Sequence, residues 1–210
     1  MVWDFLKDDI EPRLPARRRV VLTMALVGVL TGLVSSLPLP IPEIRLEEDG
    51  LILNTPGSPL HAGIAFAAGI ASCMWAWVSR DLGKCLLTAL LVLLGWLAAV
   101  NTANDLYQLL IGSGAFGTAT GAKEGREAVG LMLGGVVAGG VGAGLTAFGA
   151  GIPAKAIRRH QSWSPIVLIG ALVGVMLYPA AALRLPYLIF VPWQALVAAS
   201  IGVGLSLIHI

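Results

Sequence analysis

Six long apolar segments constrain the fold of this chain more than any other feature of its sequence. A helix needs about 20 apolar residues to cross about 30 Å of hydrocarbon, and in lipid only a helix satisfies its own backbone hydrogen bonds. The sequence predicts such spans over residues 20–37, 60–78, 82–100, 128–152, 165–183 and 187–208. We therefore expect an all-α fold, a polytopic helical membrane protein with a bundle of at least six transmembrane helices.

The composition agrees with a protein that is surrounded by lipid. Of the 210 residues, 57% are hydrophobic and only 12% are charged, whereas about 25% of the residues in an ordinary soluble domain are charged. So few charges cannot cover the surface of a water-soluble domain of this size. The excess of hydrophobic over charged residues excludes a disordered chain, a basic nucleic-acid-binding domain and a soluble enzyme of ordinary surface chemistry. The expected partner is the lipid bilayer, with no nucleic acid.

The distribution of lysine and arginine predicts how the spans are oriented. With the N-terminus in the cytoplasm, ten of these residues fall inside and four fall outside (Arg45, Lys123, Arg126 and Arg184), which together make the 14 of the chain. Short cytoplasmic loops of membrane proteins are enriched in lysine and arginine. We therefore expect a cytoplasmic N-terminus, a location in the plasma or inner membrane, and outer loops at 38–59 and 101–127.

The two ends of the chain differ from the region between them. Residues 1–19 form the predicted cytoplasmic segment, and acids that alternate with Trp3, Phe5 and Leu6 predict a short interfacial helix there. The last six residues, 205–210, resemble the translated end of a transposon used in sequencing libraries, so we interpret them as a non-native scar. On that interpretation the transmembrane domain, 20–204, stops inside its sixth helix and the native chain continues.

The link between the fifth and sixth segments is unusually short. It consists of Arg184, Leu185 and Pro186, with Pro179 before it and Pro192 after it. Proline removes a helical hydrogen bond and bends or breaks a helix. The stretch 178–193 is therefore open to two interpretations, two full spans or a kinked, re-entrant element.

Glycine is concentrated in the fourth segment. Three Gly-x-x-x-Gly pairs follow one another there, made by Gly130, Gly134, Gly135, Gly139, Gly140 and Gly144. In lipid, such pairs let helix backbones approach closely. We interpret them as helix-packing positions inside the bundle. The alternative is a face that lines a pore or joins a second copy or another membrane protein.

One group of polar residues is a candidate binding site. Asn101, Asn104 and Asp105 share a helix face at the outer end of the third segment. A carboxylate between two amides can coordinate a cation or hold a proton, and intramembrane ionisable residues are functional candidates. Arg184, at the same predicted membrane face, is a candidate partner of Asp105. The alternatives are a solvated helix end capped by Asn101 and an arginine that reaches lipid headgroups.

Residues for enzyme chemistry are sparse. Cys73 and Cys85 have no metal-binding or redox spacing, and the histidines (His61, His160 and His209) stand in no nucleophile or metal motif. The run from Gly112 to Gly117 matches a dinucleotide-binding pattern but lacks the strand and helix around it. The sequence predicts neither a catalytic residue nor a metal site nor a cofactor.

Three functional hypotheses remain. Glycine-rich helices, a carboxylate at the membrane boundary and compact loops favour a subunit or fragment of a small-solute or ion transport or channel-type protein. The interpretation that the native chain continues beyond residue 204 favours a membrane-anchor or sensor domain of a longer signalling or enzymatic protein. A membrane enzyme that acts on lipid is the third hypothesis, and no motif supports it.

Overall fold

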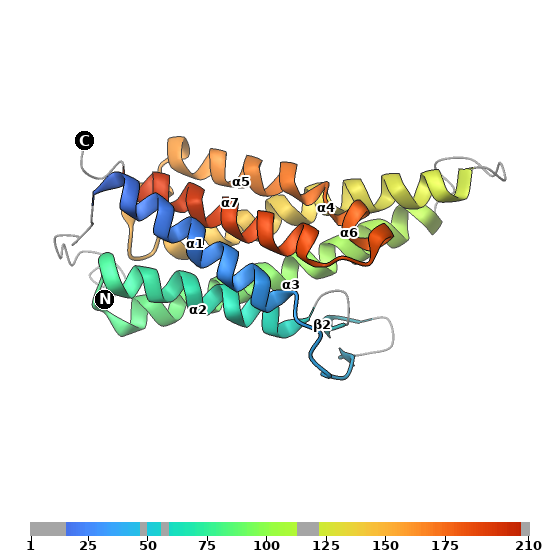
Figure 1. Ribbon diagram of the computed structural model, residues 1–210, viewed down its shortest axis with the longest axis horizontal. Helices are drawn as coiled ribbons and strands as arrows, with labels where there is room; N and C mark the ends of the chain where they lie inside the picture. Colours follow the sequence, from blue (N-terminus) through green and yellow to red (C-terminus); the bar gives the residue numbers. More distant parts are fainter. Residues whose placement is uncertain (1–15, 47–49, 56–58, 113–121, 207–210) are drawn as a thin grey trace.

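The computed structural model describes residues 16–46, 50–55, 59–112 and 122–206. It is helical except for a small hairpin (Figure 1), which confirms the predicted all-α class. The helices are α1 (Arg17–Ser35), α2 (Leu60–Trp77), α3 (Leu82–Gly112), α4 (Ala122–Ala150), η2 (Lys155–Arg158), α5 (His160–Gly174), α6 (Leu177–Leu183) and α7 (Tyr187–Ser206). Six helical stretches are long and apolar enough to cross a membrane, with α5 and α6 counted as one.

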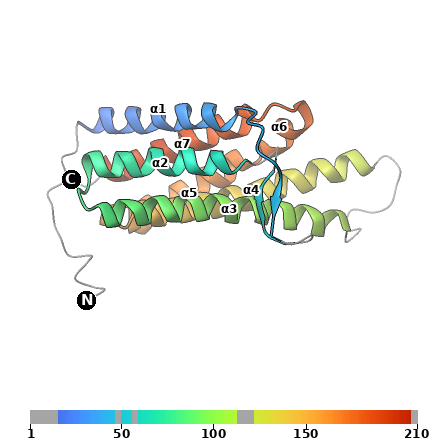
Figure 2. The ribbon, with the colours of Figure 1, turned by 90° about the horizontal axis from the view of Figure 1, so that it is seen from below.

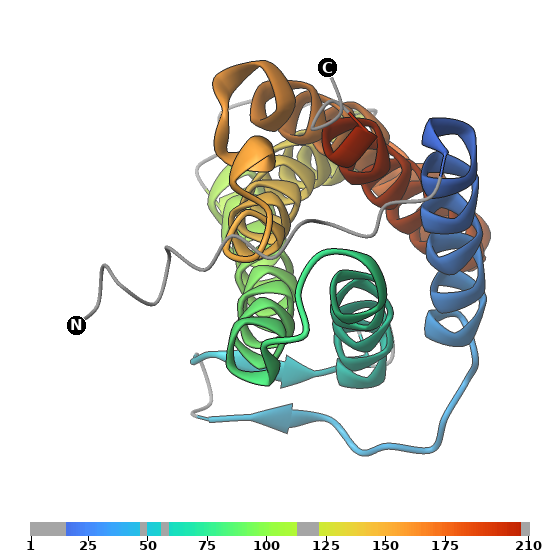
Figure 3. The same cartoon turned by 90° about the vertical axis from the view of Figure 1, so that its left-hand side faces the viewer.

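The six long helices form a closed ring. Around the ring, α1 packs on α2, α2 on α3, α3 on α4, α4 on α5, α5 on α7, and α7 again on α1. The view along the bundle shows this arrangement (Figure 3). The first and last helices are therefore neighbours, and the core lies in the middle of the ring.

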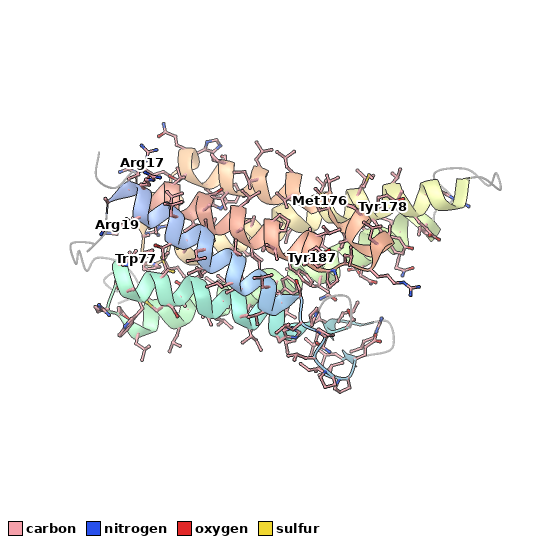
Figure 4. The ribbon with its side chains drawn as sticks, viewed as in Figure 1. Arg17, Arg19, Trp77, Met176, Tyr178 and Tyr187 are labelled. Carbon is pink, nitrogen blue, oxygen red and sulfur yellow. The ribbon has the colours of Figure 1, made fainter. Side chains whose placement is uncertain are left out.

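The two ends of the bundle carry different groups. One end, called here the basic end, gathers positively charged residues. They are Arg17, Arg18 and Arg19 at the start of α1, Arg80 and Lys84 around the start of α3, and Lys155, Arg158 and Arg159 between α4 and α5. Figure 4 places Arg17, Arg19 and Trp77 at this end, and Tyr178 toward the other. The opposite end, called the hairpin end, carries strands β1 (Ile44–Arg45) and β2 (Ile52–Asn54), which pair antiparallel (Figure 2).

The third and fourth helices are longer than predicted. The expected third span ended at residue 100, but α3 continues to Gly112, and α4 begins at Ala122 rather than at residue 128. At 31 residues, α3 is about 46 Å long. Polar residues after residue 100 suggested a helix end, yet this stretch contains no proline to stop a helix. The extension of α3 also packs on α4, since Gly134 lies against the backbone of Ala103.

The predicted fifth span is two helices. Between α5 and α6 the backbone makes tighter turns, in which the Met176 N–H donates to the Val173 carbonyl at 2.9 Å. Pro179 has no N–H for the Val175 carbonyl, so one helical hydrogen bond is missing where α5 would otherwise join α6. The kink therefore falls at residues 175 and 176, just before the stretch 178–193, whereas α7 continues through Pro192 as one helix.

The described part of the chain leaves some predictions untested. The predicted interfacial helix within residues 1–15 lies outside the described residues. The same holds for residues 207–210 of the interpreted scar and for nearly all of the run Gly112–Gly117. Of residues 205–210, Leu205 and Ser206 are described, and they form the last residues of α7.

The distribution of residue types between the core and the exterior is unusual for a protein in water. Buried positions include polar residues, among them Ser35, Thr88, Thr146 and Gln194. Large leucines instead cover the outside of the bundle. On α1, the exposed leucines Leu22, Leu26, Leu30 and Leu33 are 51–56% exposed.

Candidate functional site

Asn101 holds the small hairpin against α3. Its Oδ1 accepts a hydrogen bond from the N–H of Ile52 at 2.8 Å, and its Nδ2 donates to the carbonyl of Ile52 at 3.0 Å. Nδ2 also donates to the carbonyl of Leu97, one turn earlier in α3. Both polar atoms of this side chain are therefore engaged with the protein backbone. Asn101 is not the cap of a helix end, since α3 continues for another eleven residues.

Asn54 organises the other side of this hairpin. Its side chain is almost completely buried, and its Nδ2 donates to the carbonyl of Pro42 at 2.7 Å. Its Oδ1 accepts from the N–H of Leu60, the first residue of α2, at 2.8 Å. A free N–H at the start of a helix normally needs such a partner. Asn54 thus joins the hairpin to α2, a role that the sequence analysis missed.

The other predicted site residues lie close to a cavity at the hairpin end. Asn104 and Arg184 line it, while Asp105 is exposed beside it and accepts a hydrogen bond from Nδ2 of Asn104 at 3.3 Å. Asp105 and Arg184 do not form an ion pair with each other. Arg184 follows α6 with φ 55° and ψ 38°, and it is the one non-glycine residue with positive φ in the described ranges.

This cavity, called here the funnel, has a volume of about 620 Å³. Residues from the hairpin, α3, α4, α6 and α7 line it, so it opens between elements that are far apart in the sequence. Its polar lining residues are Glu43, Arg45, Thr55, Asn104, Tyr107 and Arg184. Glu43 and Arg45 form an ion pair with each other. The guanidinium of Arg184 has no such carboxylate partner among the described residues.

A smaller cavity of about 80 Å³ adjoins the funnel deeper in the bundle, and we call it the aromatic cavity. The two cavities share the lining residues Val100, Ala103, Leu177 and Ile189. Its aromatic lining residues are Trp96, Phe190 and Trp193. The indole N–H groups of Trp96 and Trp193 are both buried without a hydrogen-bond partner. Buried indole N–H groups usually find an acceptor, so these two donors are left unsatisfied by the described part of the protein.

The aromatic cavity is closed toward the basic end. The ring of Trp193 packs edge-on against Phe66, with ring centroids 5.6 Å apart. Beyond these rings a continuous buried core includes Met24, Ile70 and Val197. The funnel and the aromatic cavity lie side by side and are together called the passage, and the packed core residues lie between them and the basic end.

No family model, curated protein or solved structure matches the chain. Its function therefore has to follow from its own residues. Within the described ranges, no group of three His, Cys, Asp or Glu side chains is placed to hold a metal ion.

A buried amide lies next to Trp193. Gln194 is fully buried on α7, and its Nε2 donates to the Ser35 hydroxyl of α1 at 2.8 Å. Its Oε1 is buried without a partner. A glutamine in an apolar segment is a visible signal that the sequence analysis passed over. Trp96 and Trp193 carry no such signal, because tryptophan is also common in cores and at membrane interfaces.

The predicted packing glycines make three different kinds of contact. A Cβ atom on Gly135 or Gly139 would collide with the backbone of Gly174 or Gly170, so α4 and α5 touch through two facing glycine pairs. Gly130 and Gly134 instead face α3, against Tyr107 and Ala103. Gly140 and Gly144 have room, since the nearest atom to an added Cβ is 3.5 Å away in each case.

Proposed function

We propose that the bundle spans the plasma or inner membrane with its basic end in the cytoplasm. The exposed leucines support insertion, because a soluble protein rarely exposes so large an apolar surface. The arginines and lysines at one end support the orientation, since cytoplasmic loops are rich in these residues. In this orientation the funnel opens to the outer side.

We further propose that the protein is a transport or channel-type membrane protein for a small solute or ion. The observation that carries this proposal is the pair of adjoining cavities that make up the passage: the funnel has polar lining residues, and the aromatic cavity beside it is lined by Trp193, which packs on Phe66. Transporters commonly hold their substrates near the bilayer midplane, where helices are interrupted. Here the interruption between α5 and α6 adjoins the aromatic cavity, since Gly174 and Leu177 both line that cavity.

The predicted polar residues take different roles in this proposal. Asn104 and Arg184 contact the solute at the funnel mouth, and Asp105 acts on it from the rim. Asn101 holds the hairpin in place and does not bind the solute, because both its polar atoms already bond to the backbone. The indole N–H groups of Trp96 and Trp193 are donors for an acceptor atom of the solute deeper in the passage.

Flux measurements in proteoliposomes test the proposal. The panel should contain proton, sodium and potassium gradients read with ion-sensitive dyes, and neutral and charged small solutes read by vesicle swelling. We expect flux of at least one of these, lost when Ala138→Leu fills the aromatic cavity and reduced in Asp105→Asn and Arg184→Gln. Ala68→Leu, an equal change at an exposed position of α2, is the matched control. A folded protein without flux across the whole panel would contradict the transport proposal.

A ligand-sensing membrane domain is the second candidate. It is favoured by the position of the funnel at the hairpin end, opposite the beginning of α1 and the last described residues of α7 (Figure 1). A sensor binds its ligand on one side and passes a change to the other side. Saturable quenching of tryptophan fluorescence by a solute, abolished by Ala138→Leu and without any flux, would favour this candidate over transport.

A further inference from the structure

A third cavity lies on the outside of the ring, away from the funnel. Here α4 and α5 enclose an apolar groove of about 860 Å³. Its floor is formed by Gly140 and Gly144, and its walls are formed by apolar side chains. Those used below are Val136 and Phe148 of α4 and Trp163 and Val167 of α5. Every residue that lines this groove is apolar or glycine.

The groove exists because the contact between α4 and α5 is close at one end only. Near the middle of the bundle the two facing glycine pairs bring the backbones together. Closer to the basic end, the bulk of Trp163 and Val167 holds α5 away from α4, and their atoms lie 3.5 and 3.6 Å from a Cβ built on Gly144. The glycines on the floor have no side chains to fill the resulting space.

The length of the groove fits one leaflet of a bilayer. It extends along α4 from Val136 to Phe148, which is about 18 Å at a rise of about 1.5 Å per residue. Half of a hydrocarbon core is about 15 Å thick. The groove thus reaches from the basic end to about the midplane, the distance that one acyl chain of that leaflet covers.

Positive charge lies where the groove meets the basic end. Arg159 immediately precedes α5, and its carbonyl accepts from the N–H of Trp163 at 3.0 Å, so Arg159 is one turn from the groove. The side chain of Arg158 lies against Gly151, just after the end of α4. Both arginines are exposed. Trp163 is 38% exposed, and tryptophan favours the boundary between hydrocarbon and headgroups.

We infer that this groove binds an anionic phospholipid. One acyl chain lies over Gly140 and Gly144, and the headgroup phosphate lies against Arg158 and Arg159. Arginine suits a phosphate because its planar guanidinium donates two parallel hydrogen bonds. The inference rests on the membrane orientation proposed above but not on transport.

A second copy of the chain fits the groove less well. Two copies in one membrane share the same orientation, so their basic ends would lie side by side if α4 and α5 of both copies met. The arginines around the groove would then face like charges, which repel each other. An anionic lipid instead neutralises them.

Quenching of Trp163 by lipids with brominated acyl chains tests the inference. The protein is reconstituted in phosphatidylcholine that contains the same small fraction of brominated phosphatidylglycerol or brominated phosphatidylcholine. The fluorescence of Trp163 is obtained as the difference in tryptophan fluorescence between the wild type and Trp163→Phe. We expect brominated phosphatidylglycerol to quench Trp163 at lower mole fractions than brominated phosphatidylcholine does. This preference for the anionic lipid should fall about fivefold for each arginine that Arg158→Gln or Arg159→Gln removes.

Two controls separate this site from general attraction to the basic end. The double variant Arg17→Gln and Arg18→Gln removes charge from α1, which α7 separates from α5 in the ring (Figure 3), and should keep the preference. Gly144→Leu fills the groove and should lower quenching by both lipids. Equal quenching of Trp163 by the two lipids, or an equal loss in the α1 variant, would overturn the inference. So would a dimer in native mass spectrometry that Gly140→Leu dissociates, since a second copy would then occupy the groove.

Discussion

The side-chain amide of Asn101 pairs with the backbone of Ile52 as a neighbouring strand would, accepting from its N–H at 2.8 Å and donating to its carbonyl at 3.0 Å. The contact joins α3 to β2 across 49 positions of the sequence. Ile52 itself lines the funnel. The polar residue that appeared most suited to cap a helix therefore positions one wall of the candidate site.

Replacing Asn101 should loosen the hairpin without unfolding the bundle. Asn101→Leu leaves the N–H and carbonyl of Ile52 without their partner, which we expect to cost about 1–3 kcal/mol. Hydrogen–deuterium exchange of peptides that cover residues 50–55 should become faster, while exchange in the core of α3 stays unchanged. Gln108→Leu, at an exposed position of the same helix, is the matched control. Slow exchange in Asn101→Leu would show that the hairpin is held by other contacts.

The facing glycines of α4 and α5 should be intolerant of any side chain. In Gly174→Ala the new Cβ meets the carbonyl oxygen of Gly135, so the helices must separate, at a cost of about 1–3 kcal/mol. Thermal unfolding in detergent, followed by fluorescence-detected size-exclusion chromatography, measures the loss. Gly140→Ala serves as the control, because its Cβ would lie 3.5 Å from that of Ala171. Equal melting temperatures for the two variants would contradict the close contact.

Ser35 and Gln194 should be energetically coupled. Ser35→Ala removes the hydroxyl that accepts from Nε2 of Gln194 and leaves a fully buried amide without a partner. We expect a loss of about 1 kcal/mol. Gln194→Leu removes the whole amide, including its unpaired Oε1, and should be close to neutral. The double variant, with Ser35→Ala added to Gln194→Leu, should therefore have nearly the same unfolding free energy as Gln194→Leu alone. A double-mutant cycle of unfolding free energies measures this coupling, and additive losses would argue against it.

Cysteine labelling tests the proposed orientation. The native cysteines Cys73 and Cys85 are buried, so they give little background. We expect Leu46→Cys, at the hairpin end, to react with a membrane-impermeant maleimide in intact cells. Gln161→Cys, at the basic end, should react only after the membrane is opened. The reverse pattern would mean that the funnel opens to the cytoplasm.

Much of the helical architecture follows from local properties of the sequence. The apolar segments are long enough to cross a membrane, and each such helix satisfies its own backbone. Their ends are less predictable, as α3 shows, because polar residues such as Asn101 suit both a helix end and a helix that continues past the hydrocarbon. The break before α6 has a visible cause in Pro179, yet Pro192 does not interrupt α7. Proline alone therefore did not decide between a kink and a full span.

The candidate site was harder to predict than the fold. Asn104 and Arg184 were identified from their residue type, but no local pattern connects them with Glu43, Tyr107 or the two tryptophans. These residues come from different elements of the ring and meet only when the helices pack. The same holds for glycine, since Gly135 and Gly140 look alike in the sequence but one contacts a backbone and the other lines an open groove.

Helix formation in an apolar environment depends on hydropathy and on the residues within each segment. For this reason the sequence by itself determined that the protein is a set of apolar helices with basic residues gathered in alternate loops. Only the tertiary structure decided that α1 and α7 close the ring, that Asn101 supports a strand, and that Trp193 lines a cavity beside the funnel. Those outcomes depend on which helix faces pack together. Each such contact depends on residues of both helices, which are far apart along the chain.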